Sequence, residues 1–212
     1  MVFQTEALVL RHYPFGEAHR VVVFLSRDRG RVRAVAYGAG SPRSRFGSSL
    51  ELMTHVRAVF RHREGQELAV VENCEIIQPS PAFRLGLEEN LYLGYFAELL
   101  AEFTREEAGA ETVFRLALAS LDALDAGVEL RILARYMELW LLRLEGVLPE
   151  PAAALPPDLG RRCAAMMRRR PRELVEEQWN SADLQQLEEW TGRLIESHLE
   201  KPLKSRRFLQ QV

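Results

Sequence analysis

The hydrophobic periodicity of the chain changes at the segment Gln78-Pro79-Ser80-Pro81. Before it, short β-branched and apolar runs lie between turn residues, and from Leu50 to Phe60 apolar side chains recur at every second residue, the period of a half-buried strand. After it, apolar side chains recur every three or four residues, the period of a helix. Two prolines cannot continue a central strand. The sequence therefore predicts an α+β, multidomain chain, with a β domain over residues 1–78 and a helical domain over residues 79–212.

Five short strands are predicted before the break, and turn residues separate them. In the fourth, apolar side chains occupy even positions from Leu50 to Phe60, while Glu51, His55 and Arg57 occupy odd ones. Closing such a sheet removes its exposed edges, so we expect an OB-type five-stranded β-barrel. The predicted strands are Gln4–Leu10, Arg20–Ser26, Gly30–Ala36, Leu50–Phe60 and Leu68–Ile77.

Apolar stripes at helical spacing follow the break and predict an all-α helical bundle. The stripe from Leu133 to Leu144 is apolar over much of the helix circumference, so this helix is expected at the centre of the bundle. Residues Pro149–Pro157 contain four prolines and predict a loop. The four stripes run over Leu91–Phe103, Phe114–Leu121, Leu133–Leu144 and Leu184–His198.

Charge is distributed unevenly, although 28 basic and 30 acidic residues give a formal net charge of −2. Residues 11–63 hold eleven arginines and three acidic residues, a balance of +8, whereas residues 64–212 hold 17 basic and 26 acidic residues. A basic barrel segment indicates contact with nucleic acid, and an acidic helical part suits a protein partner. A genome rich in G and C would also favour arginine over lysine, but it would not remove acidic residues from positions 11–63.

Sequence motifs of the common enzyme classes are missing: there is no HExxH, no strand-bounded GxGxxG and no P-loop. We therefore expect neither an enzyme nor a cofactor, and we name no catalytic residue. The five histidines match no zinc motif, and Cys74 and Cys163 lie too far apart for one, so no metal site is expected. The low cysteine content fits a reducing cytoplasm, and the longest uncharged run, about nine residues, is too short to cross a bilayer.

The arginines of the barrel segment are the candidate nucleic-acid site. Arg31 and Arg33 leave the same face of one strand, because they are two positions apart and only Val32 lies between them. Cations displace counterions from phosphates, and aromatic rings stack on unpaired bases. The alternative is an ordinary solvated charged surface, and core packing is an equal alternative for Tyr13, Phe15 and Tyr37. The predicted DNA-binding residues are Arg20, Arg31, Arg33, Arg43, Arg45, Phe46 and Arg57.

A second candidate site lies in the helical part, where Arg131 and Arg135 are one helical turn apart. Arg135 precedes a very apolar sequence, so these cations could hold an acidic, hydrophobic peptide. The alternative is an i,i+3 ion pair between Arg135 and Glu138.

Several segments resemble the RecO family of bacterial recombination mediators, in the same order along the chain. They cover the predicted first three strands, the basic loop after them, one helix and the C-terminal basic stretch. The segments are Thr5–Arg11, Tyr13–Glu17, Arg20–Val22, Gly30–Val32, Ala36–Ala39, Pro42–Phe46, Arg135–Gly146 and Lys201–Arg206.

The resemblance implies an N-terminal OB domain, a C-terminal helical domain and a role in recombinational DNA repair in the cytoplasm, at the nucleoid. It implies binding to single- and double-stranded DNA, annealing of complementary strands and loading of recombinase onto strands coated by single-strand-binding protein. It transfers DNA contact to Arg31, Arg33, Arg43 and Arg45. A different class of function, a protein-interaction adaptor with the barrel as scaffold, is the alternative.

The resemblance also implies two partners: RecR, on the OB side, and the acidic tail of single-strand-binding protein, at Arg135 in the helical domain. Many family members carry a four-cysteine zinc module after the helix that here ends at Gly146. In this sequence the corresponding place holds prolines and alanines, so we expect a variant without zinc.

Overall fold

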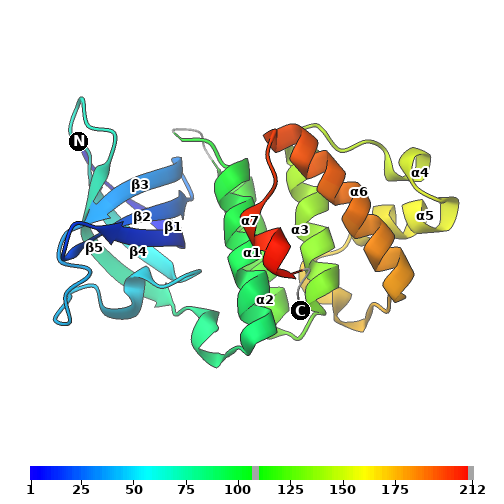
Figure 1. Cartoon of the computed structure of the whole chain (residues 1–212), viewed down its shortest axis with the longest axis horizontal. Helices are drawn as coiled ribbons and strands as arrows, with labels where there is room; N and C mark the ends of the chain where they lie inside the picture. Colours follow the sequence, from blue (N-terminus) through cyan, green and yellow to red (C-terminus); the bar gives the residue numbers. More distant parts are fainter. Residues whose placement is uncertain (107–109, 210–212) are drawn as a thin grey trace. The chain divides into compact units, whose positions relative to one another are not determined.

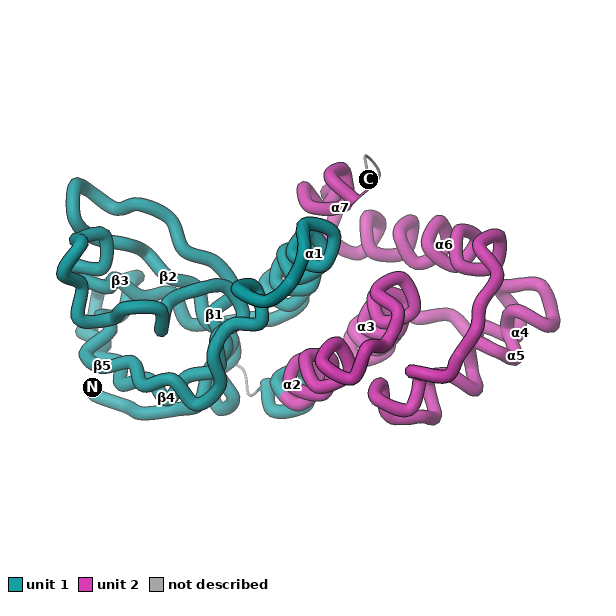
Figure 2. The backbone as a smooth tube through the Cα atoms, turned by 90° about the horizontal axis from the view of Figure 1, so that it is seen from below, with its two compact units in different colours: residues 1–114 teal, residues 115–212 magenta. Residues whose placement is uncertain are grey.

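The computed structural model describes residues 1–106 and 110–209. The chain forms two compact units, residues 1–114 and residues 115–212, shown in different colours in Figure 2. The predicted boundary after residue 78 separates strands from helices, whereas the compact units divide within helix α2 (Glu111–Asp125). The first unit therefore includes helix α1 (Leu87–Phe103) as well as the strands.

The N-terminal strands form a closed barrel in the order β1-β2-β3-β5-β4, which confirms the predicted fold (Figure 1). Strand β1 is longer than predicted and serves both of its neighbours: residues 2–8 pair with β4 and residues 7–15 pair with β2. A register shift between Val9 and Arg11 marks the bend. The strands are β1 (Val2–Phe15), β2 (His19–Ser26), β3 (Gly30–Ala36), β4 (His55–Arg61) and β5 (Ala69–Gln78).

The prediction placed the start of the fourth strand too early, at Leu50. Residues Gly47–Leu50 form a 3₁₀ turn, η1, and β4 begins only at His55. Met53 has a φ of 58°, a left-handed conformation that interrupts any extended run between Leu50 and His55. From His55 onward the alternation holds, because Val56, Ala58 and Phe60 are buried and Arg57 is exposed.

The inner core of the barrel consists of apolar side chains from all five strands, with Phe46 and Leu50 added from the loop before β4. Helix α1 packs against β1 and β2. This helix explains why β2 is buried continuously from Val21 to Ser26, since such a strand has apolar neighbours on both faces. A short 3₁₀ turn, η2 (Pro81–Arg84), connects the last strand to α1.

In the second unit, α3 packs against α6, and residues Ile132–Leu139 of α3 are all buried, as expected for a central helix. The predicted loop Pro149–Pro157 instead contains a short helix, α4, because Pro151 occupies the first helical position, where its missing N–H costs nothing. The elements after α2 are α3 (Leu130–Leu144), α4 (Pro151–Ala154), α5 (Pro157–Met166), η3 (Pro171–Glu176), α6 (Ser181–Leu199) and α7 (Lys204–Leu209).

His55, at the start of β4, makes the free energy of unfolding depend on pH. The residue is 8% exposed, and its ring packs edge-on against Phe114, with a centroid distance of 5.6 Å. Burial lowers the pKa of His55, and this outweighs the Glu6 carboxylate, whose Oε2 lies 3.4 Å from Nε2. The folded protein therefore holds His55 neutral at pH values where the unfolded chain protonates it.

We predict that the free energy of unfolding falls as the pH drops below about 6.5, the ordinary histidine pKa. His55 contributes fully above that pH, and its contribution is lost as the pH approaches the lowered folded pKa. Urea unfolding at pH 7.5 and 5.5 measures the loss, which should be smaller in His55→Gln. His12, whose pKa is also lowered, by burial and then by Arg20, remains in both proteins. Equal losses in the two proteins would contradict the prediction.

Candidate nucleic-acid interface

One end of the barrel presents three exposed aromatic side chains. Tyr13, Phe15 and Tyr37 are 39%, 45% and 50% exposed, so core packing, the alternative open for them in the sequence, does not hold. Strand pairing brings them to the same end: Phe15 pairs with His19, and the His19 ring contacts Tyr37 at 5.0 Å between centroids. Nδ1 of His19 also accepts a hydrogen bond of 3.0 Å from the Gly38 amide. We call this end, with the loop of residues 38–46, the rim.

The rim loop carries two exposed arginines above a buried ring. Phe46 is 5% exposed and belongs to the inner core of the barrel, so its predicted role as a stacking platform for bases does not fit this structure. The ring instead anchors the loop. The Arg45 guanidinium carbon lies 4.9 Å from the Phe46 ring centre, and Arg45 donates a hydrogen bond of 3.4 Å to the Val71 carbonyl.

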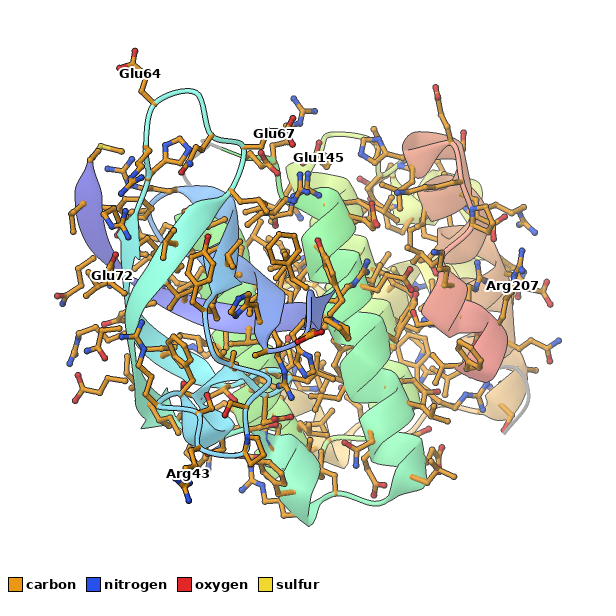
Figure 3. All side chains as sticks on the ribbon, turned by 60° about the vertical axis from the view of Figure 1, so that its left-hand side comes forward. Arg43, Glu64, Glu67, Glu72, Glu145 and Arg207 are labelled. Carbon is orange, nitrogen blue, oxygen red and sulfur yellow. The ribbon has the colours of Figure 1, made fainter. Side chains whose placement is uncertain are left out.

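Arg43 extends from the rim loop into solvent (Figure 3). Within residues 1–106 and 110–209 its side chain has no ion-pair partner. The loop backbone that supports it is closed by a turn, in which the Ser44 amide donates to the Ser41 carbonyl at 3.0 Å. Arg43 and Arg45 are therefore cations on a loop that is fixed at both its turn and its buried ring.

Other predicted DNA-binding arginines already face acidic side chains. Arg20 lies 3.9 Å from Glu51, and Arg57 lies 3.5 Å from Glu75 of the neighbouring strand. Arg61 of the same face pairs with Glu72 at 2.5 Å. The whole β region, residues 1–78, holds eleven arginines and eight acidic residues, so its net charge is +3. The rim therefore differs from the surface of β4 and β5 in the pairing of its arginines more than in total charge. Arg43 and Arg45 have no acidic partner among the described residues, whereas Arg57 and Arg61 do.

Arg31 and Arg33 leave the same face of β3, as predicted, but their surroundings differ. Arg31 donates a hydrogen bond of 2.8 Å to the Ala101 carbonyl at the end of α1, and its Nε lies 3.7 Å from Glu106. Its side chain therefore links β3 of the barrel to the C-terminal end of α1 by a hydrogen bond. Arg33 is half-buried and has no ion-pair partner in the described part of the chain.

Arg135, the candidate partner-binding residue, is a structural cation. It is 4% exposed, and its guanidinium contacts Glu138 at 2.6 Å and Glu188 at 2.8 Å, which confirms the i,i+3 ion pair. Glu138 also accepts a hydrogen bond of 2.5 Å from Thr191 on α6. Arg131 is half-buried and has no ion-pair partner among the residues that the structure describes.

The described residues contain no group of three or more His, Cys, Asp or Glu side chains that could hold a metal ion. Cys163 lies on α5, the helix predicted for its segment, and burial raises the pKa of its thiol to about 12. In the same described residues, no helix is long and apolar enough to span a bilayer.

Two family models match consecutive parts of the chain: Recombination protein O N terminal over residues 1–80 and Recombination protein O C terminal over residues 84–153. The chain is 37% identical over 150 residues to the DNA repair protein RecO of Koribacter versatilis, covering 71% of this chain and 61% of that protein. It is 39% identical over 142 residues to the DNA repair protein RecO of Anaeromyxobacter sp. (strain K), covering 67% and 56%. The matches thus span about three fifths of the length of these relatives.

The buried position of Arg135 generates a stability prediction. Arg135→Met should lower the free energy of unfolding by about 3 kcal/mol or more, because it leaves the buried Glu138 carboxylate with one cation fewer. The matched variant Arg131→Met should change it by less than about 0.5 kcal/mol, since Arg131 has no ion-pair partner among the described residues. Urea unfolding of both variants measures the difference. Similar small effects would contradict the structural role of Arg135.

Proposed function

The chain belongs to the RecO family, and from this we propose that it is a DNA-binding mediator of recombinational repair. In this proposal it binds single- and double-stranded DNA, anneals complementary strands and helps to load recombinase onto DNA coated by single-strand-binding protein. Such work requires no nucleotide hydrolysis and no nucleophile, in keeping with a sequence that lacks enzyme motifs.

The single observation that carries the proposal is the rim, where exposed aromatic rings lie beside arginines with no acidic partner among the described residues. Arg43 and Arg45 would contact phosphates and release counterions. Tyr13, Phe15 and Tyr37 would stack on bases, each worth about 1–3 kcal/mol. Both kinds of contact ignore base identity, as annealing of any complementary pair requires.

Annealing follows from charge neutralisation at this surface. Two single strands repel each other through their phosphates, and arginines that bind the backbone reduce this repulsion while the Watson–Crick edges remain able to pair. Stacking at the rim has to be weak enough for a base to leave when its complement arrives. A small platform of three rings suits this better than a deep groove.

The proposed protein partners are RecR, on the barrel side, and the acidic tail of single-strand-binding protein, in the helical part. For the tail, Arg131 is a better candidate than Arg135, because the charge of Arg135 is already balanced by Glu138 and Glu188. Isothermal titration of a peptide with the tail's sequence against wild type and Arg131→Met tests this assignment.

We predict that Arg43→Ala combined with Arg45→Ala weakens binding to single-stranded DNA of any sequence. The slope of log affinity against log salt should fall by about one to two, since each lost phosphate contact contributes about 0.7. The matched control, Arg57→Ala with Arg61→Ala, removes the same charge from residues that face Glu75 and Glu72, and its slope should stay close to wild type. Fluorescence anisotropy of a labelled oligonucleotide across a salt series provides both slopes.

The annealing assay itself mixes complementary strands with the purified protein at low salt, alone and with single-strand-binding protein. The proposal expects annealing faster than without protein, and slower annealing in the Arg43/Arg45 variant than in the Arg57/Arg61 variant. Annealing at the protein-free rate, with negligible DNA affinity, would contradict the proposal and favour the adaptor function.

A further inference from the structure

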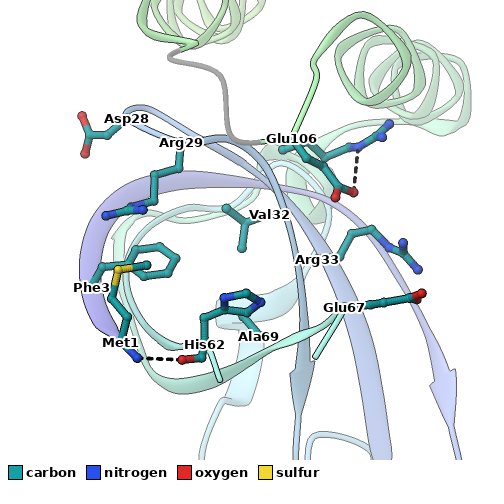
Figure 4. Close-up of a pocket in the computed structure, with 11 residues that line it drawn as sticks. Met1, Phe3, Asp28, Arg29, Val32, Arg33, His62, Glu67, Ala69 and Glu106 are labelled. Carbon is teal, nitrogen blue, oxygen red and sulfur yellow. Dashed lines mark hydrogen bonds and ion pairs between the residues drawn. The ribbon is translucent and has the colours of Figure 1, made fainter. Parts of the chain in front are cut away.

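A second feature of the barrel lies where β1 begins, at the end opposite the rim. A cavity of about 510 Å³ is lined there by the start of β1, the β2–β3 turn, the first half of β3 and the β4–β5 loop (Figure 4). It lies beside β3, which pairs with β5 at Ala34 and Val35 and whose Arg31 amide donates to the Arg105 carbonyl at 2.9 Å, so Val32 and Arg33 between these contacts flank open space. Its volume falls within the range of small-molecule sites.

A column of flat groups forms one wall of this cavity. The Phe3 ring stacks on Phe60, which is fully buried, with 5.3 Å between centroids and 29° between planes. The Arg29 guanidinium carbon lies 4.3 Å from the centre of Phe3. Because the core holds Phe60, this column has a fixed base and ends in a planar cation. Arginine planes and aromatic rings are the groups on which unpaired bases stack.

The charges around the cavity nearly cancel, which argues against a site for a polyphosphate. Three arginines, Arg29, Arg31 and Arg33, and the Met1 ammonium group, which donates a hydrogen bond of 2.8 Å to the His62 carbonyl, face three acidic residues, Asp28, Glu67 and Glu106. Arg31 is engaged by the Ala101 carbonyl and Glu106, and Asp28 accepts a hydrogen bond of 2.8 Å from Thr5.

Three polar groups remain to recognise a ligand. Arg33 and Glu67, on the same side of the cavity in Figure 4, have no ion-pair partner within the described ranges. His62 Nε2 donates a hydrogen bond of 2.8 Å to the Gln66 carbonyl, because a carbonyl oxygen can only accept. In the neutral ring the other nitrogen, Nδ1, is then a hydrogen-bond acceptor. One donor and two acceptors beside a stacking plane match the edge of a nucleobase, where donors and acceptors alternate.

We propose that this cavity, the base pocket, receives one unpaired nucleobase of a DNA strand bound to the barrel. The base stacks on the Arg29–Phe3 column, and Arg33 and Glu67 contact its polar edge. Since Glu67 accepts hydrogen bonds, a base with an amino group, such as cytosine, fits better than thymine. This inference rests on the proposed DNA-binding function and assigns it a specific subsite.

Arg29→Lys tests the stacking, because lysine keeps the charge and loses the planar guanidinium. The matched control is Arg27→Lys, an exposed arginine two residues away that pairs with Glu111 at 3.0 Å and does not line the cavity. Each protein is titrated with a labelled oligo-dC strand and with an abasic strand of the same number of phosphates. Both residues are exposed, so both variants should fold, and circular dichroism checks this.

We expect Arg29→Lys to bind oligo-dC about five- to tenfold more weakly than Arg27→Lys, which corresponds to one stacked base. On the abasic strand the two variants should bind equally. A second variant, Glu67→Gln, should lose the preference of wild type for oligo-dC over oligo-dT.

Other outcomes overturn the base pocket. Equal binding of the two lysine variants to oligo-dC would show that Arg29 stacks on no base, while the proposed DNA-binding function stands if wild type binds the strand. An equal loss on both strands would make Arg29 a phosphate contact. Failure of wild type to bind either strand would overturn the DNA-binding function together with the pocket.

Discussion

Closure of the five-stranded barrel is the constraint on which the rest of the first unit depends. Strand β1 makes closure possible, because it bends after Val9 and pairs with β4 along its first half and β2 along its second. Closure creates an apolar interior that cannot hold a charge, so every arginine of the strands has to face outward. It also produces two different ends. At the rim, the Phe46 ring fills the interior, and at the other end the base pocket lies beside the part of β3 that does not pair with β5.

The outward arginines are then distinguished by their neighbours. Pairing of β4 with β5 brings Glu72 and Glu75 beside Arg61 and Arg57, and the segment after α1 brings Glu106 toward Arg31. Such contacts reduce the benefit of exchanging an acidic side chain for a phosphate. The cations of the rim loop have no such competitor among the described residues, which is why the proposed DNA contact concentrates there.

Local patterns predicted the elements well, and contacts between distant segments explain what they missed. Alternation predicted the faces of β4, and the spacing of Arg135 to Glu138 was enough to suggest their ion pair. Phe46 is buried because the closed barrel has room for its ring, and Arg31 is hydrogen-bonded by the end of α1, 70 residues further along the chain. The residues next to Phe46 and Arg31 in the sequence do not predict either contact. Continuous burial of Val21–Ser26 did have one, an apolar run without alternation, which indicates a helix over the outer face.

Ultraviolet cross-linking and peptide mapping test whether single-stranded DNA lies on the rim of the barrel. All three tryptophans, Trp140, Trp179 and Trp190, lie in the second unit, whereas the exposed rings of the rim are Tyr13, Phe15 and Tyr37. Cross-links are expected in peptides that contain the rim residues. Cross-links confined to the tryptophan peptides of residues 115–212 would contradict this expectation.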